Sequence, residues 1–226
     1  MDDCALLAHV PLFSSIDPAH LAEIAAKLKP RAYRRGEIIF HKDDPGSTLY
    51  IIKTGQVKIS TGTPDGEEVI LAILADTDFF GELSILDGDP RSASAAAMET
   101  THALVLHRSD FLAVIQSHPE LAKNILATMS HRLRRTDHLL EDSVFLDLSA
   151  RLAKRLLELA EKHGRETDEG VQIDLRLTQQ DLANVVGASR VAVNRLLGQF
   201  QDRGLLSIDR HRITITRADS LRERVY

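Results

Sequence analysis

One stretch of the chain, residues 79–93, combines a carboxylate and a guanidinium with glycine-rich turns. A carboxylate accepts hydrogen bonds from neighbouring hydroxyls, and a guanidinium grips a phosphate through its planar fork. A glycine beside them lets the backbone turn sharply and approach a ligand closely. The stretch is therefore a candidate cradle for a ligand with a diol and a phosphate, and the alternative is a hairpin with a surface Glu and a surface Arg. The residues suited to this chemistry are Gly81, Glu82, Arg91, Ser92 and Ala93.

This stretch resembles the phosphate-binding cassette of cyclic-nucleotide-binding domains, in the order Phe-Gly-Glu-Leu, a short loop, and Arg-Ser-Ala. The sequence departs from that pattern at none of these positions. The resemblance implies that Glu82 holds the ribose 2′-hydroxyl and that Arg91 and Ser92 hold the cyclic phosphate. Backbone amides around Leu83 and Ala93 would contribute as well. The predicted ligand-binding residues of the cassette are Gly81, Glu82, Leu83, Ser84, Arg91, Ser92 and Ala93.

Short strands must position this cassette. From about Ala32 to Leu106, segments rich in Ile, Val, Leu and Tyr alternate with turn residues, after a short helical segment at residues 11–29. Regularly spaced short strands with glycine turns are typical of an antiparallel sandwich or barrel. Pro64-Asp65-Gly66 predicts a hairpin turn. We therefore predict one small β-roll with strands at Glu37–His41, Leu49–Lys53, Gln56–Ser60, Glu68–Leu74 and Ala103–His107.

A long helix is predicted after Pro119 and ends around residues 145–149, where we place a hinge. Residues spaced alternately by four and three form a heptad seam, typical of a helix that packs against a second copy. We therefore predict a homodimer, and the alternative is an amphipathic helix lying on its own domain. The seam consists of Ala122, Leu126, Met129, Leu133, Thr136, Leu140 and Ser143.

Thr136 and Asp137 extend the ligand prediction to this helix. In the dimeric transcription regulators that the cassette resembles, a threonine here reaches the base, and its neighbour reaches across from the other subunit. The best-known cyclic-AMP regulator has serine where this chain has Asp137. A carboxylate only accepts, so adenine N1 would repel it, whereas guanine offers N1–H and a 2-amino group. We hypothesise that cyclic GMP binds comparably to or better than cyclic AMP, and the alternative is that Asp137 points to solvent.

A pair of helices is predicted near the C-terminus, after a helix at 150–162, a polar loop at 163–170 and an edge strand at 171–175. Thr178 and Asp181 form a capping-box-like helix start. Gly187 suits a tight turn, and a second helix begins at Ser189. Apolar residues of this second helix face the core, and no acidic residue occurs in 189–199. The pattern predicts a helix-turn-helix, and the alternative is a helical hairpin with a basic solvated face.

The exposed face of the second helix carries the predicted DNA contacts. Arg190 and Arg195 are each suited to a bidentate contact with guanine, and Asn194 to adenine or a phosphate. The cyclic-AMP members of the dimeric regulators that the cassette resembles typically have a glutamate where this chain has Val191, which is suited to a thymine methyl instead. A β-hairpin wing is predicted from 205–209 and 212–216, joined at Arg210-His211. Gln179, Ser189 and the helix N-termini are predicted to position phosphates, and Thr178 is also among the predicted DNA-binding residues.

Composition limits the remaining possibilities. The 226 residues are 43% hydrophobic and 27% charged, which suits one or two globular domains. Cys4 is the single cysteine, so no internal disulfide can form, and a reducing cytoplasm is expected. The acidic N-terminus lacks a signal-peptide core, and no membrane association is expected. The net charge is −5, yet residues 147–226 hold 14 basic and 12 acidic residues, which favours DNA binding by this half.

The order of cassette, long helix and winged helix-turn-helix resembles the cyclic-AMP receptor protein / fumarate–nitrate-reduction regulator superfamily over nearly the whole chain. The implied fold class is α+β, with a β-roll domain at 1–118, a dimerisation helix and hinge at 119–146, and a DNA-binding domain at 147–226. The implied function is a dimeric transcription regulator that binds a palindromic DNA operator when cyclic AMP or cyclic GMP binds, with RNA polymerase as a further partner.

No nucleophile–base motif or Walker-type loop occurs, so an enzyme is not expected. No metal or haem is expected either, because the cassette is intact. Two alternatives stay open at this point. One is a regulator of the same superfamily with another effector such as haem, and the other is a nucleotide sensor that acts through a protein partner.

Overall fold

The computed structural model describes residues 2–63, 66–209 and 212–225. The chain forms two compact units, Met1–Thr61 with Leu71–Arg135, and Gly62–Ile70 with Thr136–Tyr226. The predicted turns at Pro64-Asp65 and Arg210-His211 lie outside the described residues. The limits predicted for the three domains stay predictions. In the described part of the chain, no helix is long and apolar enough to cross a membrane.

The first unit starts with α1, which was not predicted, and the helical segment predicted at 11–29 consists of a 3₁₀ turn and the short helix α2. Asp17 caps α2 by accepting from the backbone N–H of Ala19 at 2.8 Å, and Pro18 opens the helix. The helices of this unit are α1 (Asp3–Leu7), η1 (Pro11–Phe13), α2 (Pro18–Ala25), α3 (Leu83–Leu86), α4 (Arg108–Ser117) and the first part of α5 (Glu120–Phe145). Its strands are β1 (Lys29–Tyr33), β2 (Ile38–Phe40), β3 (Thr48–Thr54), most of β4 (Val57–Gly62), the second half of β5 (Glu68–Leu74), β6 (Phe79–Phe80), β7 (Ser94–Ala97) and β8 (Thr101–His107).

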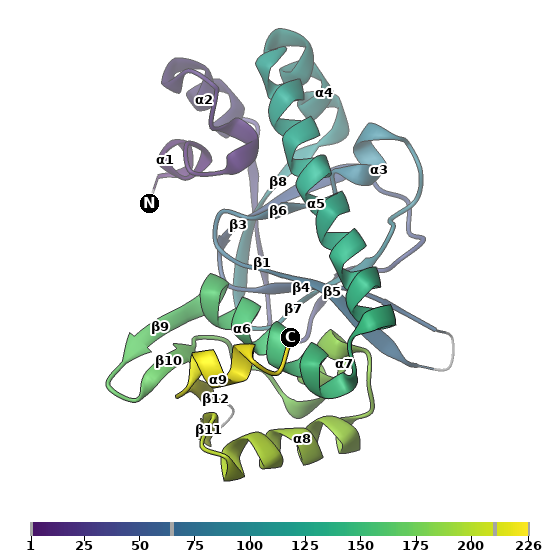
Figure 1. The fold of residues 1–226 in the computed structure, drawn as a ribbon. Coiled ribbons are helices and arrows are strands. Elements are labelled where there is room, and N and C mark those ends of the chain that lie inside the picture. The colour runs from purple at the N-terminus through teal and green to yellow at the C-terminus, as the bar shows by residue number, and fades with distance from the viewer. Residues whose placement is uncertain (1, 64–65, 210–211, 226) are drawn as a thin grey trace. The chain divides into compact units, whose positions relative to one another are not determined.

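The strands build the predicted antiparallel roll from two four-stranded sheets, ordered β1-β8-β3-β6 and β2-β7-β4-β5 (Figure 1). Three strands were not predicted, β1, β6 and β7. β1 is exposed along almost its whole length, and β6 has two residues. β7 consists of Ser and Ala only. None of these patterns shows the apolar alternation from which a strand is recognised.

Two apolar cores hold this unit together. The larger joins α1, α2, α4 and the start of α5 to β3 and β8, and it includes the fully buried Phe13 and Phe111. Figure 1 shows α1, α2 and α4 gathered at one end of the sheets. The smaller core fills the roll itself, around Ile52, Val57 and Phe80. The stretch that contains the cassette connects both cores, because Phe79 belongs to the first and Phe80 to the second.

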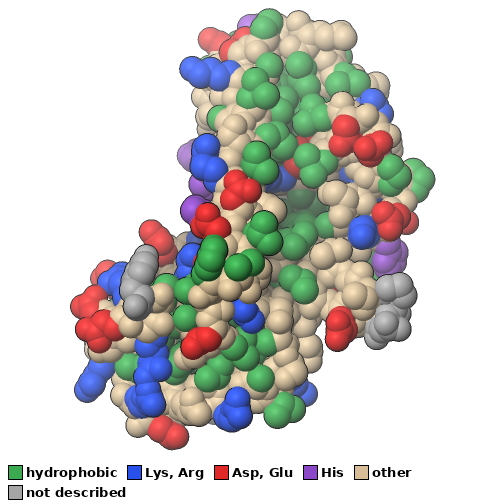
Figure 2. Space-filling view, turned by 45° about the vertical axis from the view of Figure 1, so that its right-hand side comes forward, with side chains coloured by type: hydrophobic (Ala, Val, Ile, Leu, Met, Phe, Trp, Pro, Cys, Tyr) green, Lys and Arg blue, Asp and Glu red, His purple; other side chains and the backbone are tan. Residues whose placement is uncertain are grey.

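Helix α5 ends at Phe145, within the predicted range. Its Leu121 and Ile125 are buried against the larger core. Three seam leucines point away from that core, because Leu126, Leu133 and Leu140 are 68%, 63% and 65% exposed. Figure 2 shows hydrophobic side chains exposed on the face of the molecule that it draws. Met129 of the seam packs partly against that core whereas the three leucines are exposed, and the homodimer stays a prediction.

The second unit is a winged helix-turn-helix. Its sheet order is β11-β12-β10-β9. The predicted edge strand is therefore wrong, because β10 lies between β9 and β12, and the predicted polar loop contains the edge strand β9. All four residues of β9 are exposed, which removes the apolar signal of a strand. The elements are α6 (Leu148–His163), β9 (Gly164–Thr167), β10 (Gly170–Ile173), α7 (Gln179–Val186), α8 (Arg190–Asp202), β11 (Leu206–Asp209), β12 (Arg212–Ile215) and α9 (Ala218–Arg222).

Local sequence signals set the limits of the two central helices. Thr178 and Asp181 form the predicted capping box at the start of α7. Gly187 ends α7 in the left-handed conformation, with φ of 64°, which glycine adopts without the clash of a side chain. Ser189 caps α8 by accepting from the backbone N–H of Ala192. Val193 and Leu197 of α8 are buried, as predicted.

Candidate functional site

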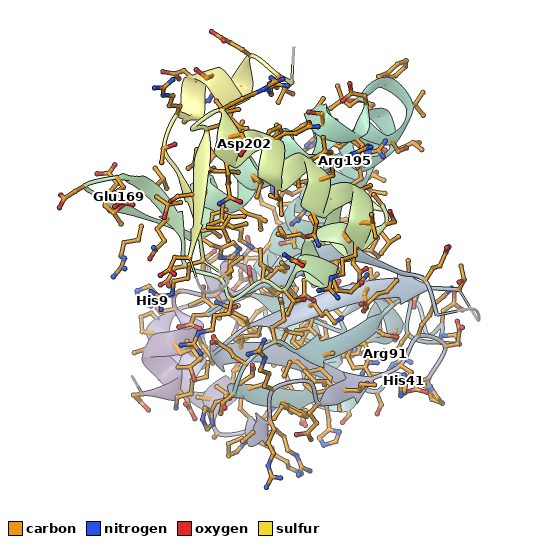
Figure 3. All side chains as sticks on the ribbon, turned by 90° about the horizontal axis from the view of Figure 1, so that it is seen from below. His9, His41, Arg91, Glu169, Arg195 and Asp202 are labelled. Carbon is orange, nitrogen blue, oxygen red and sulfur yellow. The ribbon has the colours of Figure 1, made fainter. Side chains whose placement is uncertain are left out.

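Arg91 is buried in the β-roll, with 3% of its surface exposed (Figure 3). Its Nη1 donates to the carbonyl of Gly81 at 2.7 Å. Its Nη2 donates to the carbonyl and hydroxyl oxygens of Thr48 at 2.9 and 3.0 Å. The guanidinium also lies over the ring of Phe40, 4.3 Å from the ring centroid. The Nε–H group has no partner among the described residues.

Burial lowers the pKa of Arg91 below its ordinary value, although attraction to Tyr50, Glu82 and Asp44 opposes this shift. Desolvation penalises the charged form of a buried group. A close anion would offset this desolvation cost for the guanidinium. A phosphate that accepted from Nε would supply that charge. The site thus favours an anionic ligand.

Glu82 is 2% exposed and lies at the start of α3. Its Oε1 accepts from Nη1 of Arg132 at 2.5 Å, while Oε2 is buried and has no partner in the described part of the chain. Arg132 also donates from Nη2 to the carbonyl of Phe79 at 2.6 Å. One carboxylate oxygen is thereby fixed, and the other is left to accept a hydrogen bond from a ligand hydroxyl.

Two glycines keep the backbone close to the guanidinium. Gly81 has a φ of +83°, and a Cβ at this position would lie 2.7 Å from Nη1 of Arg91. A Cβ at Gly46 would lie 2.4 Å from the Cβ of Ser84 and 2.9 Å from Nε of Arg91. Any larger residue would therefore intrude on the space beside the unpartnered Nε. These buried groups contradict the alternative of a hairpin with a surface Glu and a surface Arg.

The other predicted cassette residues divide between the surface and the core. Ser84 and Ala93 are buried, whereas Ser92 and Leu83 are exposed. The backbone of Arg91 is fixed to the β2–β3 connection, since its N–H donates to the carbonyl of Asp44 at 2.8 Å and its carbonyl accepts from the N–H of Asp43 at 2.9 Å. The roles predicted for these residues in holding a ligand stay predictions.

Arg132 was not predicted as a site residue, because the sequence pattern places it simply among the charged residues off the seam. It lies four residues before Thr136 on α5. Thr136 and Asp137 are exposed, and they belong to the second compact unit. Their predicted contact with the base of a nucleotide stays a prediction. The signal that could have identified Arg132 is its spacing of one helical turn from Thr136.

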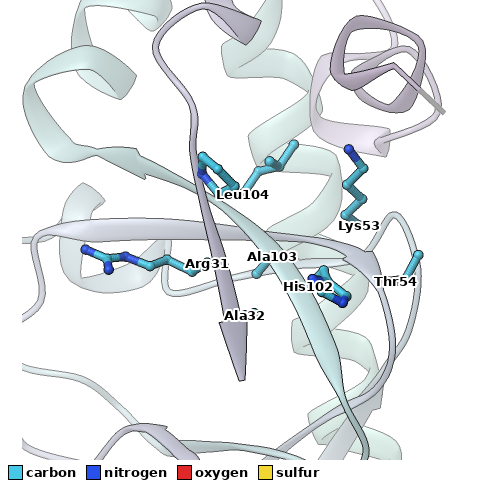
Figure 4. Close-up of a pocket in the computed structure, with 8 residues that line it drawn as sticks. Arg31, Ala32, Lys53, Thr54, His102, Ala103 and Leu104 are labelled. Atoms are coloured by element: carbon cyan, nitrogen blue, oxygen red, sulfur yellow. The ribbon is translucent and has the colours of Figure 1, made fainter. Parts of the chain in front are cut away.

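A separate pocket of about 400 Å³ lies on the sheet formed by β1, β8 and β3 (Figure 4). Its lining includes Arg31, Lys53 and His102. Lys53 is already paired with Asp3, at 2.7 Å between Nζ and Oδ1. The pocket contains none of the predicted ligand-binding residues.

The predicted DNA-contacting residues lie at the N-terminal ends of α7 and α8, and Gln179 of α7 contacts Arg190 and Asn194 of α8. Arg190, Val191 and Arg195 are exposed on α8, and Val191 is 80% exposed. Figure 3 shows Arg195 projecting from this helix. The hydroxyl of Thr178 is used within α7, where it bonds Asp181. An exposed apolar residue between arginines suits a surface that meets a base edge in the major groove.

Comparison with known proteins gives two matches within the chain. Residues 30–118 match the cyclic nucleotide-binding domain family, and residues 150–224 match the Crp-like helix-turn-helix domain family. The CRP-like cAMP-activated global transcriptional regulator of Mycobacterium tuberculosis is 36% identical over 219 residues, which cover 97% of this chain and 98% of that protein. The cyclic AMP receptor protein of Thermus thermophilus is 32% identical over 213 residues, covering 94% and 95%.

Solved structures agree in fold. The catabolite activator protein of Thermus thermophilus is 32% identical, with a TM-score of 0.55, and the match covers 95% of this chain and 98% of that one. The c-di-GMP responsive global regulator CLP of Xanthomonas campestris is 25% identical, with a TM-score of 0.78, covering 88% and 99%. The relatives are transcription regulators, so this chain has a regulatory and not an enzymatic role. The chain belongs to the Crp/Fnr superfamily of transcription regulators.

Proposed function

We propose that this regulator is a dimer that binds a palindromic DNA operator when a cyclic nucleotide, cyclic AMP or cyclic GMP, occupies the cassette. The observation that carries the proposal is a pair of buried, oppositely charged side chains, each with one polar atom left over. Within the described residues, Glu82 keeps a free acceptor in Oε2, and Arg91 keeps a free donor in Nε.

These two atoms match the two ends of a cyclic nucleotide. A ribose 2′-hydroxyl would donate to Oε2 of Glu82, and a cyclic phosphate oxygen would accept from Nε of Arg91. The glycines on either side leave room for the ligand, since a side chain at Gly46 would meet Nε. Relatives named for cyclic AMP support an adenine base, and the carboxylate of Asp137 supports guanine.

The second half of the proposal concerns DNA. The exposed leucine seam of α5 would pair two copies of the chain. Two recognition helices α8 would then meet successive major grooves ~34 Å apart on a palindrome. Nucleotide would shift the protein towards this arrangement by as much as its affinity differs between the two states.

The test is Arg91→Leu. We expect this variant to lose nucleotide-stimulated operator binding in a fluorescence anisotropy titration while light scattering still reports a dimer. The physical reason is that Leu cannot donate to the phosphate. Arg35→Leu, at an exposed arginine of the same unit, is the matched control and should respond to nucleotide as the wild type does.

Glu82→Gln provides a second variant with nearly unchanged volume. Calorimetry should show weaker nucleotide binding, because the amide keeps one acceptor but loses the ion pair with Arg132. A response to nucleotide that survives in Arg91→Leu would show that the cassette is not the effector site. Operator affinity should also fall steeply with salt, and a flat salt response would favour a protein partner over DNA.

A further inference from the structure

We propose that Gln179 is a positioning residue that sets the guanidinium of Arg190 for reading a guanine, and is not chiefly a phosphate contact. This inference rests on the proposed binding of DNA by α8. It comes from one oxygen atom, Oε1 of Gln179, which accepts from two residues of the recognition helix at once.

The contacts connect α7 to α8. Nε and Nη2 of Arg190 donate to Oε1 of Gln179 at 3.4 and 3.2 Å. Nδ2 of Asn194, one turn further along α8, donates to the same oxygen at 2.8 Å. A residue at the first position of α7 therefore contacts two of the side chains that the sequence predicts to face DNA.

The chemistry of the three side chains fixes their orientation. A guanidinium only donates, so Gln179 must turn its oxygen towards Arg190. Asn194 must then present its NH₂ group to that same oxygen, and its own Oδ1 is left buried without a partner among the described residues. Buried polar atoms are normally hydrogen-bonded, so the unpartnered Oδ1 of Asn194 is a cost of this orientation. We infer from this cost that the contact to Gln179 determines how the Asn194 amide is oriented.

This orientation has a consequence for base recognition. The Nε/Nη2 edge of Arg190 is occupied by Gln179, so the edge formed by Nη1 and Nη2 is the one left for a bidentate partner. Guanine offers two acceptors, O6 and N7, to such an edge in the major groove. A guanidinium that is already oriented loses less conformational freedom when it binds. It can then form both hydrogen bonds only with a base that lies in one position. Gln179 would thus raise discrimination for guanine at this position.

Two substitutions of similar size separate this role from a phosphate contact. Gln179→Met removes the acceptor, and Gln179→Glu keeps it while adding a charge that DNA repels. The operator position to be tested is the one at which Arg190→Ala no longer distinguishes guanine from adenine. We measure affinity for the operator, for the operator with adenine at that position, and for unrelated DNA.

We expect Gln179→Met to lower the guanine-to-adenine ratio by roughly tenfold, within the range of one bidentate base contact, with little change on unrelated DNA. Gln179→Glu should bind all DNA more weakly and keep the ratio. In the double variant Gln179→Met/Arg190→Ala, the ratio should match Arg190→Ala alone, because the two residues act through one contact. Gln201→Met, at an exposed glutamine near the end of α8, should leave the ratio unchanged.

An equal loss on every DNA in Gln179→Met would make Gln179 a phosphate contact and overturn the inference. An unchanged ratio in Gln179→Met would overturn it as well. If Arg190→Ala alters discrimination nowhere, Gln179 positions no base-reading group and the inference fails, although operator binding stands. A wild-type protein that prefers no DNA sequence would instead refute the proposed function itself.

Discussion

Glu82 and Arg91 each bury a charged group and leave one of its polar atoms without a partner in the described part of the chain. An unsatisfied buried polar group costs about 1–3 kcal/mol, and more when it is charged. Arg132 offsets part of this cost for Glu82, whereas Arg91 is compensated by its hydrogen bonds to Gly81 and Thr48 and by the ring of Phe40. A ligand with a hydroxyl and a phosphate would satisfy both buried atoms, and the removal of these two costs would favour its binding.

Asp137 is the residue that we expect to determine which base of that ligand is preferred. We predict that Asp137→Ser shifts the preference towards cyclic AMP by about tenfold, the size of one hydrogen bond to a charged group. Serine both donates and accepts, so it no longer repels adenine N1. Competitive titration of the two nucleotides measures the shift, and Glu141→Ser on the same helix is the control. A strong preference for cyclic AMP that is unchanged in Asp137→Ser would show that this carboxylate does not meet the base.

At the scale of elements, the join between α5 and α6 depends on a buried group of charges. Asp142 is 5% exposed and accepts from Nζ of Lys154 at 2.6 Å and from Nη2 of Arg155 at 3.0 Å. Arg155 in turn pairs with Glu158. The last turn of α5 and the first half of α6 are therefore held together by charge as well as by packing.

We predict that Asp142→Asn lowers the free energy of unfolding by about 3 kcal/mol, the lower end of the cost of breaking a buried ion pair. The lower end applies because Arg155 keeps Glu158, and Lys154 is 30% exposed and can turn to water. Urea denaturation followed by circular dichroism measures the change. Glu161→Gln, at an exposed carboxylate of α6, should be neutral, and an Asp142→Asn protein as stable as the wild type would mean that the ion pairs add nothing.

Local signals allowed the sequence to predict some elements and not others. The capping box at Thr178 and the cap of α8 at Ser189 follow from side chains that act on their nearest backbone neighbours, so the sequence contains the whole cause. β9 pairs through its backbone and exposes every side chain, so no pattern marks it. The contact between Arg132 and Glu82 joins residues fifty positions apart, and its cause is the packing of α5 on the roll. Long-range contacts of this kind need the fold before they can be recognised.

At the scale of the whole molecule, the exposed leucines of α5 require an explanation. Water-exposed leucines at every seventh position, 126, 133 and 140, form one stripe along the helix. Contiguous apolar stripes of this kind mark interaction surfaces in proteins. A second copy of the same helix presents the matching stripe, and its heptad spacing suits side-by-side packing. The proposed dimer therefore follows from the surface of one helix.

We predict that Leu133→Glu raises the dissociation constant of the dimer by on the order of 100-fold or more, because a two-fold interface loses two leucines, each worth ~1.5–3 kcal/mol when buried. The two new carboxylates would also repel each other. Sedimentation equilibrium measures the constant, and Arg134→Glu, an exposed charge reversal off the seam, should leave it nearly unchanged. Nucleotide binding at the cassette should persist but weaken in calorimetry, since Glu82, Arg91 and Arg132 come from one chain whereas Asp137 is expected to reach the base from the partner copy. Operator affinity should fall to that of a half-site, because one recognition helix then meets one major groove. A Leu133→Glu protein that stays dimeric, or a monomer that binds the full operator as the wild type does, would show that α5 does not pair the subunits for DNA.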